Sequence, residues 1–238
     1  MTKVVLITSA SSGIGRVTAL FLAQQGYIVY AGTRDPAKFP ITLDNLHVIA
    51  LYLTDSQNIK IAINTIYNEQ GKIDILVNNT GYALVSTIED ATDEEMFKPF
   101  DVNVFGLMKM TRAVIPYMRK AQTGVIINIS SFLGKMGLPL LSHYNASKYA
   151  VEAFVDFIRF EMAPYNVRVH SIQSGLFGTN FVKKGLITNS ATTSKESPYK
   201  DLAAHFIPVG SEATTFEPLR KELSDEYFEN KVKDAFGL

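Results

Sequence analysis

Two side chains that could transfer a proton lie one helical turn apart in the segment HYNASKYA (143–150). Tyr144 precedes Lys148 by four positions, so in a helix both side chains lie on the same face. A nearby ammonium favours a phenolate over a phenol, which would suit acid/base chemistry near neutral pH. The pair alone is weak evidence, because Tyr227 and Lys231 repeat the spacing and such pairs arise by chance. The surrounding elements must decide between the two pairs.

Short β-branched segments alternate along the chain with longer segments of helical periodicity. The six expected strands cover residues 3–8, 27–32, 46–53, 73–79, 124–130 and 167–172. The expected helices cover 14–25, 56–70 and the surroundings of 102–120 and 145–162. Near-continuous apolar strands separated by helices indicate a parallel sheet with helices on both faces.

We therefore predict an α/β fold, a three-layer, doubly wound Rossmann-type sheet, as a single domain over residues 1–238. Within it, residues 179–238 are expected to form a substrate loop and a C-terminal helical tail. This tail shows no clear strand pattern, so the final edge strand of such a sheet is not accounted for.

Composition narrows the choice of partners. Lys plus Arg and Asp plus Glu both number 23, so no basic excess points to nucleic acid or to an acidic membrane surface. No apolar run approaches the roughly 18 residues of a membrane span. The absence of cysteine excludes disulfides and thiolate chemistry and fits a reducing compartment. We expect a cytoplasmic protein that binds small molecules, with no metal and no nucleic-acid or membrane partner.

The first expected strand runs directly into TSASSGIGR (8–16) and then into a helix. In such a unit the glycines let the backbone approach a pyrophosphate at the positive end of the helix. A Gly-x-Gly pair alone is a weak signal, since a tight turn that helps a helix to pack gives the same pattern. The residues expected to contact a nucleotide here are Thr8, Ser9, Ser11, Ser12, Gly13, Ile14 and Gly15.

The second expected strand ends at Thr33 and Arg34, about 20 residues beyond the glycines, where an acid would bind the ribose 2′-OH of NAD or an arginine the 2′-phosphate of NADP. Arg34 therefore favours NADP(H). NAD(H) stays an alternative because Asp35 follows, and Arg34 could also be an ordinary solvent-facing side chain.

Six elements in order over residues 3–180 resemble the short-chain dehydrogenase/reductase family. TSASSGIG (8–15) is similar to its T-G-x-x-x-G-x-G loop, and NNTG (78–81) to its N-N-A-G segment. The remaining elements are Asn103 in VNVFG, Ser131 in ISS, Tyr144 and Lys148 as Y-x-x-x-K, and SGLFGT (174–179) as P-G-x-x-x-T. Tyr227 and Lys231 have no such setting, so we assign them to an exposed helix face.

The resemblance implies roles for four catalytic residues. Tyr144 would give a proton to a carbonyl oxygen, or take one from an alcohol, while a nicotinamide transfers hydride at the adjoining carbon. Lys148 would lower the pKa of the phenol and hold the nicotinamide ribose. Ser131 would hydrogen-bond the substrate oxygen, and Asn103 would support a proton relay through water. The resemblance also implies cofactor contacts for Asn79, Tyr144, Lys148, Gly175 and Thr179.

Four positions depart from the family pattern. Ser9 replaces the first glycine of the loop, and Thr80 replaces the alanine of N-N-A-G. Tyr52 stands where many members have an aspartate that touches adenine, and Ser174 replaces a proline. Ser9 would be strained if its backbone requires a positive φ. Because none of the four belongs to the acid/base set, we expect retained chemistry with an altered grip on the cofactor.

We expect an NADP-dependent carbonyl reductase or alcohol dehydrogenase. FLGKMGLPLLSHY (132–144) and the Phe and Leu residues of the tail would make an apolar pocket, which favours a hydrophobic alcohol or carbonyl such as a steroid, retinoid or lipid-derived compound. The alternative is a nucleotide-binding sensor or regulatory protein with the same fold and little turnover, suggested by Ser9, Tyr52 and Thr80. The helix around 145–162 is apolar nearly all round, so we also expect a homodimer that packs it and the helix around 102–120 against their copies.

Overall fold

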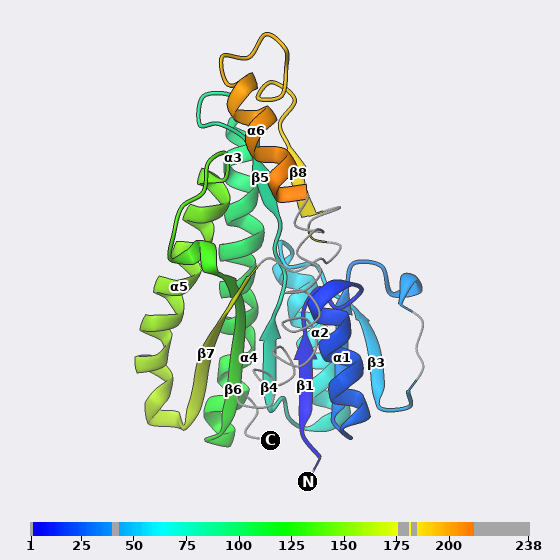
Figure 1. Ribbon diagram of the computed structural model, residues 1–238. Coiled ribbons are helices and arrows are strands. Elements are labelled where there is room, and N and C mark those ends of the chain that lie inside the picture. The colour runs from blue at the N-terminus through cyan, green and yellow to red at the C-terminus, as the bar shows by residue number, and fades with distance from the viewer. Residues whose placement is uncertain (1, 40–42, 176–180, 182–184, 212–238) are drawn as a thin grey trace.

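A six-stranded parallel sheet forms the centre of the computed structural model, which describes residues 2–39, 43–175, 181 and 185–211. The strand order is β3-β2-β1-β4-β6-β7, with every neighbouring pair parallel (Figure 1). The strands are β1 (Val4–Ile7), β2 (Ile28–Thr33), β3 (Leu46–Ala50), β4 (Ile75–Asn78), β6 (Gly124–Ser131) and β7 (Val167–Ser174). All six expected strands are confirmed, and so is the doubly wound α/β fold.

The main helices lie where the periodicity places them. They are α1 (Gly13–Gln24), α2 (Ser56–Gln70), α4 (Leu107–Ala121) and α5 (Ser142–Met162). The start of the helix expected around 102–120 is a π-helical segment, η2 (Asp101–Gly106), and α3 (Asp93–Phe100), which was not expected, precedes it. Short 3-10 turns are η1 (Pro36–Lys38), η3 (Phe132–Gly134) and η4 (Ala163–Tyr165).

Local sequence explains where several helices begin and end. The Asp55 side chain accepts hydrogen bonds from the backbone N–H groups of Gln57 and Asn58, which satisfies two free donors at the start of α2. Gly71 ends that helix in the left-handed conformation with φ of 70°. Thr92 and Glu95 form a capping box at the start of α3.

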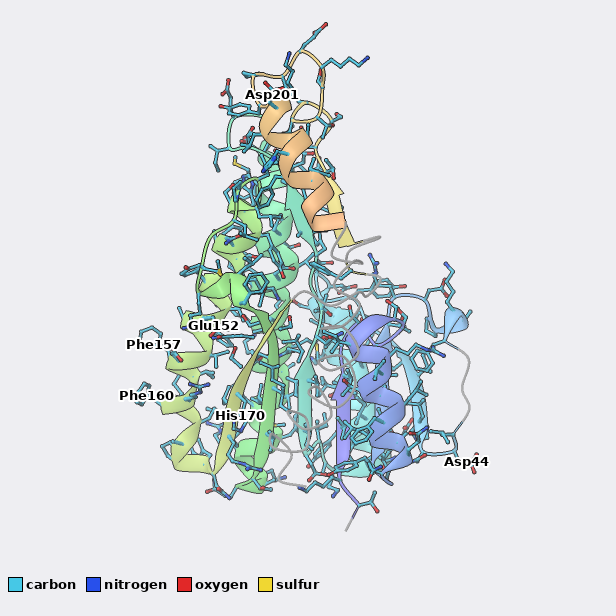
Figure 2. The ribbon with its side chains drawn as sticks, viewed as in Figure 1. Asp44, Glu152, Phe157, Phe160, His170 and Asp201 are labelled. Atoms are coloured by element: carbon cyan, nitrogen blue, oxygen red, sulfur yellow. The ribbon has the colours of Figure 1, made fainter. Side chains whose placement is uncertain are left out.

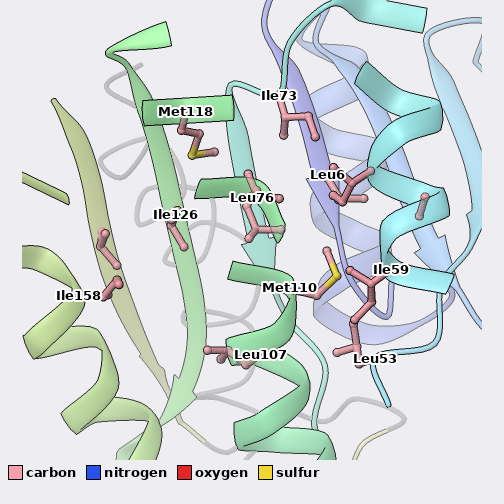
Figure 3. Close-up of a cluster of buried hydrophobic side chains, with 14 of the residues drawn as sticks. Leu6, Leu53, Ile59, Ile73, Leu76, Leu107, Met110, Met118, Ile126 and Ile158 are labelled. Carbon is pink, nitrogen blue, oxygen red and sulfur yellow. The ribbon is translucent and has the colours of Figure 1, made fainter. Parts of the chain in front are cut away.

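Two hydrophobic cores lie on opposite faces of the sheet because alternate strand residues point to opposite sides. Leu6, Leu76 and Ile126 face α2, α4 and α5, where they meet side chains such as Met110 and Met118 (Figure 3). Val5, Ile7, Val77 and Ile127 face the other way and pack with Ala19 and Leu22 of α1. The near-continuous apolar strand sequences follow from this burial on both faces.

A small lobe stands beyond the carboxyl ends of the sheet strands (Figure 1). It contains a parallel pair, β5 (Ala83–Val85) and β8 (Leu186–Thr188), together with α6 (Lys200–Ser211). The sequence patterns did not predict this second sheet, since each of its strands has three residues. Within the described residues β7 forms one edge of the main sheet. Tyr227, Lys231 and the rest of the expected tail beyond residue 211 lie outside the described residues.

The strand order reverses between β1 and β4, since β1 leads outward to β2 and β3 while β4 leads to β6 and β7. Ligands of open α/β sheets bind beyond the carboxyl ends of the strands at such a reversal. The loop after β1 and the NNTG segment after β4 both lie there, and Thr8 N donates to the carbonyl oxygen of Val77 at 3.0 Å.

Candidate active site

Three elements bring the four predicted catalytic residues to the carboxyl edge of the sheet. Tyr144 and Lys148 lie in the first two turns of α5, Ser131 ends β6, and Asn103 belongs to the π-helical segment η2. All four side chains are buried. A Cβ atom at Gly81 would lie 3.3 Å from Asn103 Oδ1 and 3.5 Å from Lys148 Nζ, so the NNTG segment passes directly beside them.

Tyr144 is 6% exposed, and this burial raises the pKa of its phenol to about 12, although a hydrogen bond with the Ser131 side chain lowers it. Lys148 Nζ lies 5.7 Å from the centroid of the Tyr144 ring. Removal of the phenol from water has the largest effect on its pKa, and the role expected of Lys148 in lowering that pKa stays a prediction. At neutral pH the phenol holds its proton.

Lys148 is equally enclosed. Burial lowers the pKa of its ammonium to about 8, and the charge of Glu152, one turn further along α5, acts in the opposite direction. Nζ donates to the Ile129 carbonyl oxygen at 3.0 Å. An ammonium has three hydrogens, and within the described residues this is its one hydrogen-bond acceptor. The remaining donors suit the hydroxyl groups of a sugar.

Asn103 holds the NNTG segment against α5. Its Oδ1 accepts from Tyr82 N at 3.0 Å, while Nδ2 donates to Tyr82 O at 2.9 Å and to Ser147 Oγ at 3.0 Å. Ser147 Oγ in turn donates to the Tyr144 carbonyl oxygen at 2.7 Å. Both amide hydrogens of Asn103 are therefore engaged by the protein, and a water molecule could reach only the second lone pair of Oδ1.

Ser131 is fixed by its own backbone turn. Its Oγ accepts from Leu133 N at 3.1 Å and so caps η3. The hydroxyl hydrogen is left to point toward the phenol of Tyr144, with which Ser131 shares a hydrogen bond. A substrate oxygen placed between these two groups would meet two hydroxyl donors.

The loop that follows β1 has the geometry of an anion site. Ser12 precedes α1 without a side-chain cap, so first-turn N–H groups of α1 are left for another acceptor. Gly13 has φ of 56°, and a Cβ atom at Gly15 would lie 2.7 Å from the carbonyl oxygen of Ser9. Both glycines are therefore required by the backbone. Ser11 and Ile14 lie in the same loop and first turn.

Ser9 has φ of 52°, so the strain expected for a non-glycine residue at this position is present. The Asn79 side chain points toward the loop, and its Nδ2 donates to the carbonyl oxygens of Thr8 at 3.1 Å and of Ser9 at 3.2 Å. In this structure Asn79 holds the loop backbone, and the contact with a cofactor that we expected for its side chain stays a prediction.

Arg34 is exposed just beyond β2. The neighbouring carboxylate of Asp35 pairs instead with Lys38 at 2.8 Å, and this hydrogen-bonded lysine lowers the pKa of Asp35. Tyr52 Oη donates to the carbonyl oxygen of Arg34 at 2.9 Å. The tyrosine that departs from the family pattern therefore supports the backbone from which the Arg34 side chain projects.

The segment after β7 is only partly described. Ser174 Oγ donates to the Ser130 carbonyl oxygen at 2.9 Å, which joins the ends of β6 and β7. Gly175 is exposed, and a Cβ atom there would meet no atom within 4 Å among the described residues. Thr179, predicted to contact the cofactor, lies outside the described residues.

An apolar wall adjoins the phenol of Tyr144. The Phe181 ring centroid lies 5.8 Å from that of Tyr144. The other residues of this cluster include Leu133, Leu138, Leu141 and Leu186. Sequence reasoning placed 132–144 and the Phe and Leu residues of the tail here without naming them singly, and the structure identifies Phe181 and Leu186 as the tail residues in this cluster. Gly81 and Ser147 were missed, although both belong to the motif segments around Asn79 and Lys148.

The residues present fit a dinucleotide. The free N–H groups at the start of α1 suit a pyrophosphate, the exposed guanidinium of Arg34 suits a phosphate, and the unused donors of Lys148 suit a ribose. Among the described residues no helix has the length and apolar character to cross a bilayer.

Comparison with known proteins agrees with this geometry. The family model described as short chain dehydrogenase matches residues 3–189. A protein from Bacteroides thetaiotaomicron named 3-ketodihydrosphingosine reductase is 39% identical over 199 residues, which are 84% of this chain and 72% of that protein.

Solved structures show the same fold. A short-chain dehydrogenase from Streptomyces avermitilis superposes with a TM-score of 0.77 at 30% identity, over 95% of this chain and 85% of that one. A structure described as ElxO with NADP bound gives a TM-score of 0.72 at 25% identity, over 86% of this chain and 91% of that one. The chain therefore belongs to the short-chain dehydrogenase/reductase family and is an NAD(P)-dependent oxidoreductase.

Proposed function

We propose that the protein interconverts a ketone and a secondary alcohol on an apolar small molecule with NADP(H) as cofactor. The observation that carries this proposal is the buried phenol of Tyr144, which meets the hydroxyl of Ser131 on one side and the apolar wall on the other. The polar atom that reacts with this phenol therefore adjoins an apolar part of the substrate.

The side chains suggest how the reaction proceeds. A nicotinamide held at this site would supply the hydride in reduction and accept it in oxidation. Tyr144, protonated because its pKa is raised to about 12, donates its proton to the carbonyl oxygen, which Ser131 also hydrogen-bonds. The ammonium of Lys148 stabilises the phenolate left behind, and Asn103 keeps the NNTG segment against α5. A phenol that holds its proton suits reduction better than oxidation.

NADP(H) is the cofactor that the charges favour. Arg34 is exposed, and its acidic neighbour Asp35 is already paired with Lys38. A guanidinium can therefore meet a 2′-phosphate without a competing carboxylate beside it. ElxO, a structural relative, is described with NADP bound, which supports the same choice.

For the substrate we propose a lipid-derived ketone with a long alkyl chain. Phe181, Leu141 and Leu186 supply apolar surface next to Tyr144, and the cluster around Val85, Phe206 and Ile207 continues it into the lobe. An alkyl chain would contact more of this apolar surface than a small ketone could. The name of the Bacteroides relative, 3-ketodihydrosphingosine reductase, indicates a substrate of this kind for that protein.

The test is oxidation of NADPH by the purified protein with 3-ketodihydrosphingosine, a steroid ketone and cyclopentanone as substrates. We expect the highest kcat/KM with the long-chain ketone and much lower values with NADH. Tight NADPH binding without turnover of any ketone, aldehyde or quinone would instead favour the nucleotide-binding sensor or regulatory protein.

We also propose a homodimer and a cytoplasmic location. Phe157 and Phe160 of α5 are 70% and 79% exposed, and Figure 2 shows both pointing away from the sheet. Phe105, in the segment leading into α4, is exposed as well. A second copy would bury these aromatic side chains.

The absence of cysteine supports a reducing compartment and so the cytoplasmic location. Fractionation of cells expressing the tagged chain would test it.

A further inference from the structure

Three hydroxyl groups lie in contact where the cofactor loop begins. Thr8 ends the β1 segment and is fully buried, Ser9 follows it and is exposed, and Thr80 comes from the NNTG segment after β4. Thr80 Oγ1 lies 2.9 Å from Thr8 Oγ1 and 2.8 Å from Ser9 Oγ. Two of these three residues, Ser9 and Thr80, are departures from the family pattern, and the structure shows that they contact each other.

The hydrogens of this cluster can be assigned by counting. Thr8 Oγ1 accepts from Asn79 N at 2.9 Å and from Thr80 N at 3.1 Å, which uses both lone pairs of the hydroxyl oxygen. Its own hydrogen must then point to Thr80 Oγ1. Thr80 has one hydroxyl hydrogen and cannot donate to both neighbours, so with Thr8 as the donor of the first bond, Thr80 donates to Ser9 Oγ. In this chain of hydroxyl groups, Thr8 therefore donates its hydrogen to Thr80, and Thr80 donates its hydrogen to Ser9.

Ser9 ends this chain with its own hydrogen still unassigned, and within the described residues its hydroxyl has no partner other than Thr80. Its backbone is held in the left-handed conformation with φ of 52°. Asn79 Nδ2 binds its carbonyl oxygen at 3.2 Å, and Gly15 lies against the same oxygen. The hydroxyl of Ser9 is therefore fixed on the exposed side of the loop that precedes α1.

We propose that the Thr8–Thr80–Ser9 chain orients the Ser9 hydroxyl as a hydrogen-bond donor to an acceptor oxygen of the dinucleotide bound at this loop. This inference rests on the proposed use of a nicotinamide dinucleotide. Thr80 is a positioning residue, because it would act on the cofactor only through Ser9. Without the Thr80 hydroxyl, Ser9 would lose the group that fixes the direction of its own O–H.

The test uses Thr80→Val, which keeps the shape of the side chain and removes the hydroxyl, and Ser9→Ala, which keeps the Cβ atom in the left-handed position. NADPH dissociation constants are measured by fluorescence titration without any ketone. Each single variant should weaken NADPH binding by about three- to ten-fold, as the loss of one hydrogen bond predicts. The double variant should be no weaker than either single one, because both changes remove the same donor.

Thr80→Ser keeps a hydroxyl at the same place and should therefore bind NADPH with wild-type affinity. The melting temperature of each cofactor-free variant provides the second readout. If Thr80→Val lowers the melting temperature but leaves NADPH affinity unchanged, or if the two affinity losses add up in the double variant, the inference is wrong.

The failure of this inference and of the proposed function can be told apart. A protein that binds NADPH with the predicted coupling but reduces no ketone contradicts only the proposed reaction. A protein that reduces ketones while Thr80→Val binds NADPH as the wild type does contradicts only the hydroxyl chain.

Discussion

The polar side chains at the candidate site are almost fully removed from water, which sets the charge that each one carries. Burial keeps Tyr144 protonated and at the same time lowers the pKa of Lys148 to about 8. The sequence predicts that Tyr144 and Lys148 lie on one face of a helix. It does not predict how strongly burial shifts the pKa of each side chain. The size of this shift depends on Phe181, Gly81 and the strand ends, which lie far away along the chain.

Tyr144→Phe should reduce kcat/KM for the ketone by at least about 100-fold, because it removes the proton that the carbonyl oxygen receives. NADPH affinity should change by less than a few fold, since the ring stays in place. Tyr149→Phe, an exposed tyrosine on the same helix, is the matched control and should leave both constants unchanged. Substantial residual turnover in the Tyr144 variant would assign the proton transfer to another group.

Arg34→Ala should lower the preference for NADPH over NADH about ten-fold, because a charge-assisted contact with the 2′-phosphate is lost. The wild-type preference should weaken as salt is added, since Arg34 is exposed. Dissociation constants for both cofactors measure the ratio. Lys60→Ala is the control, because Lys60 is an exposed lysine of α2 and not a neighbour of Arg34 or Asp35. An unchanged ratio in the Arg34 variant would leave NAD(H) as an equal choice.

Lys148→Met should stabilise the cofactor-free protein at neutral pH while abolishing efficient turnover. The folded pKa of Lys148, about 8, lies below its ordinary value of 10.5, so the unfolded chain binds the extra proton between these two values. The stability of the wild type therefore rises with pH across this window as the cost of the buried charge disappears.

The advantage of the methionine variant should be greatest below about pH 8, at most about 3 kcal/mol, and should vanish toward pH 10.5. Urea unfolding at several pH values gives this difference in free energy. Lys60→Met, on the exposed side of α2, is the matched control for the loss of a lysine side chain. A constant difference at every pH would mean that folding does not lower the pKa of Lys148.

At the scale of elements, the small lobe depends on a polar network as well as on its apolar cluster. Asp90 Oδ2 accepts from Thr87 Oγ1 at 2.7 Å and from Thr192 Oγ1 at 2.8 Å, and Thr192 is fully buried. Asn189 Nδ2 adds a bond to Glu95 Oε2 at 2.8 Å, which ties the segment after β8 to α3. These hydrogen bonds thus hold together the lobe that would bind the alkyl chain and join it to α3.

Thr192→Val should loosen this lobe, because the shape is kept but Asp90 loses a donor inside the protein. We expect a loss of about 1 to 3 kcal/mol in stability. The KM of the long-chain ketone should rise while NADPH affinity stays unchanged, since the cofactor loop lies elsewhere. Hydrogen exchange of residues 83–85 and 186–188 would report the loosening directly. Thr193→Val is the control, because Thr193 is exposed. Unchanged exchange would show that the network does not hold the pair of strands.

The elements that could be predicted are those with strong local patterns. The six main strands are runs rich in β-branched residues, of which β1, β4 and β6 are buried on both faces, and α2 has its cap at Asp55 and its glycine at 71. The β5–β8 pair could not be found in this way, because three-residue strands about 100 residues apart leave no periodic signal. The π-helical turn around Asn103 reads as ordinary helix in the sequence, although Pro99 just before it lacks the N–H that a regular helix uses.

For the molecule as a whole, the exposed aromatic surface of α5 predicts a homodimer. Phe157 and Phe160 lie on the side of the helix opposite to the core residues Val155 and Ile158 (Figure 2). Light scattering at micromolar concentration should give about twice the 26.4 kDa mass of the chain. A charge placed in such an interface is costly, so Phe160→Asp should shift the protein toward the monomer. Val17→Asp, which replaces an exposed apolar residue of α1 on the other face of the sheet, should leave the mass of the assembly unchanged. A wild-type monomer would contradict the argument from burial, and a tetramer would mean that a second surface also pairs.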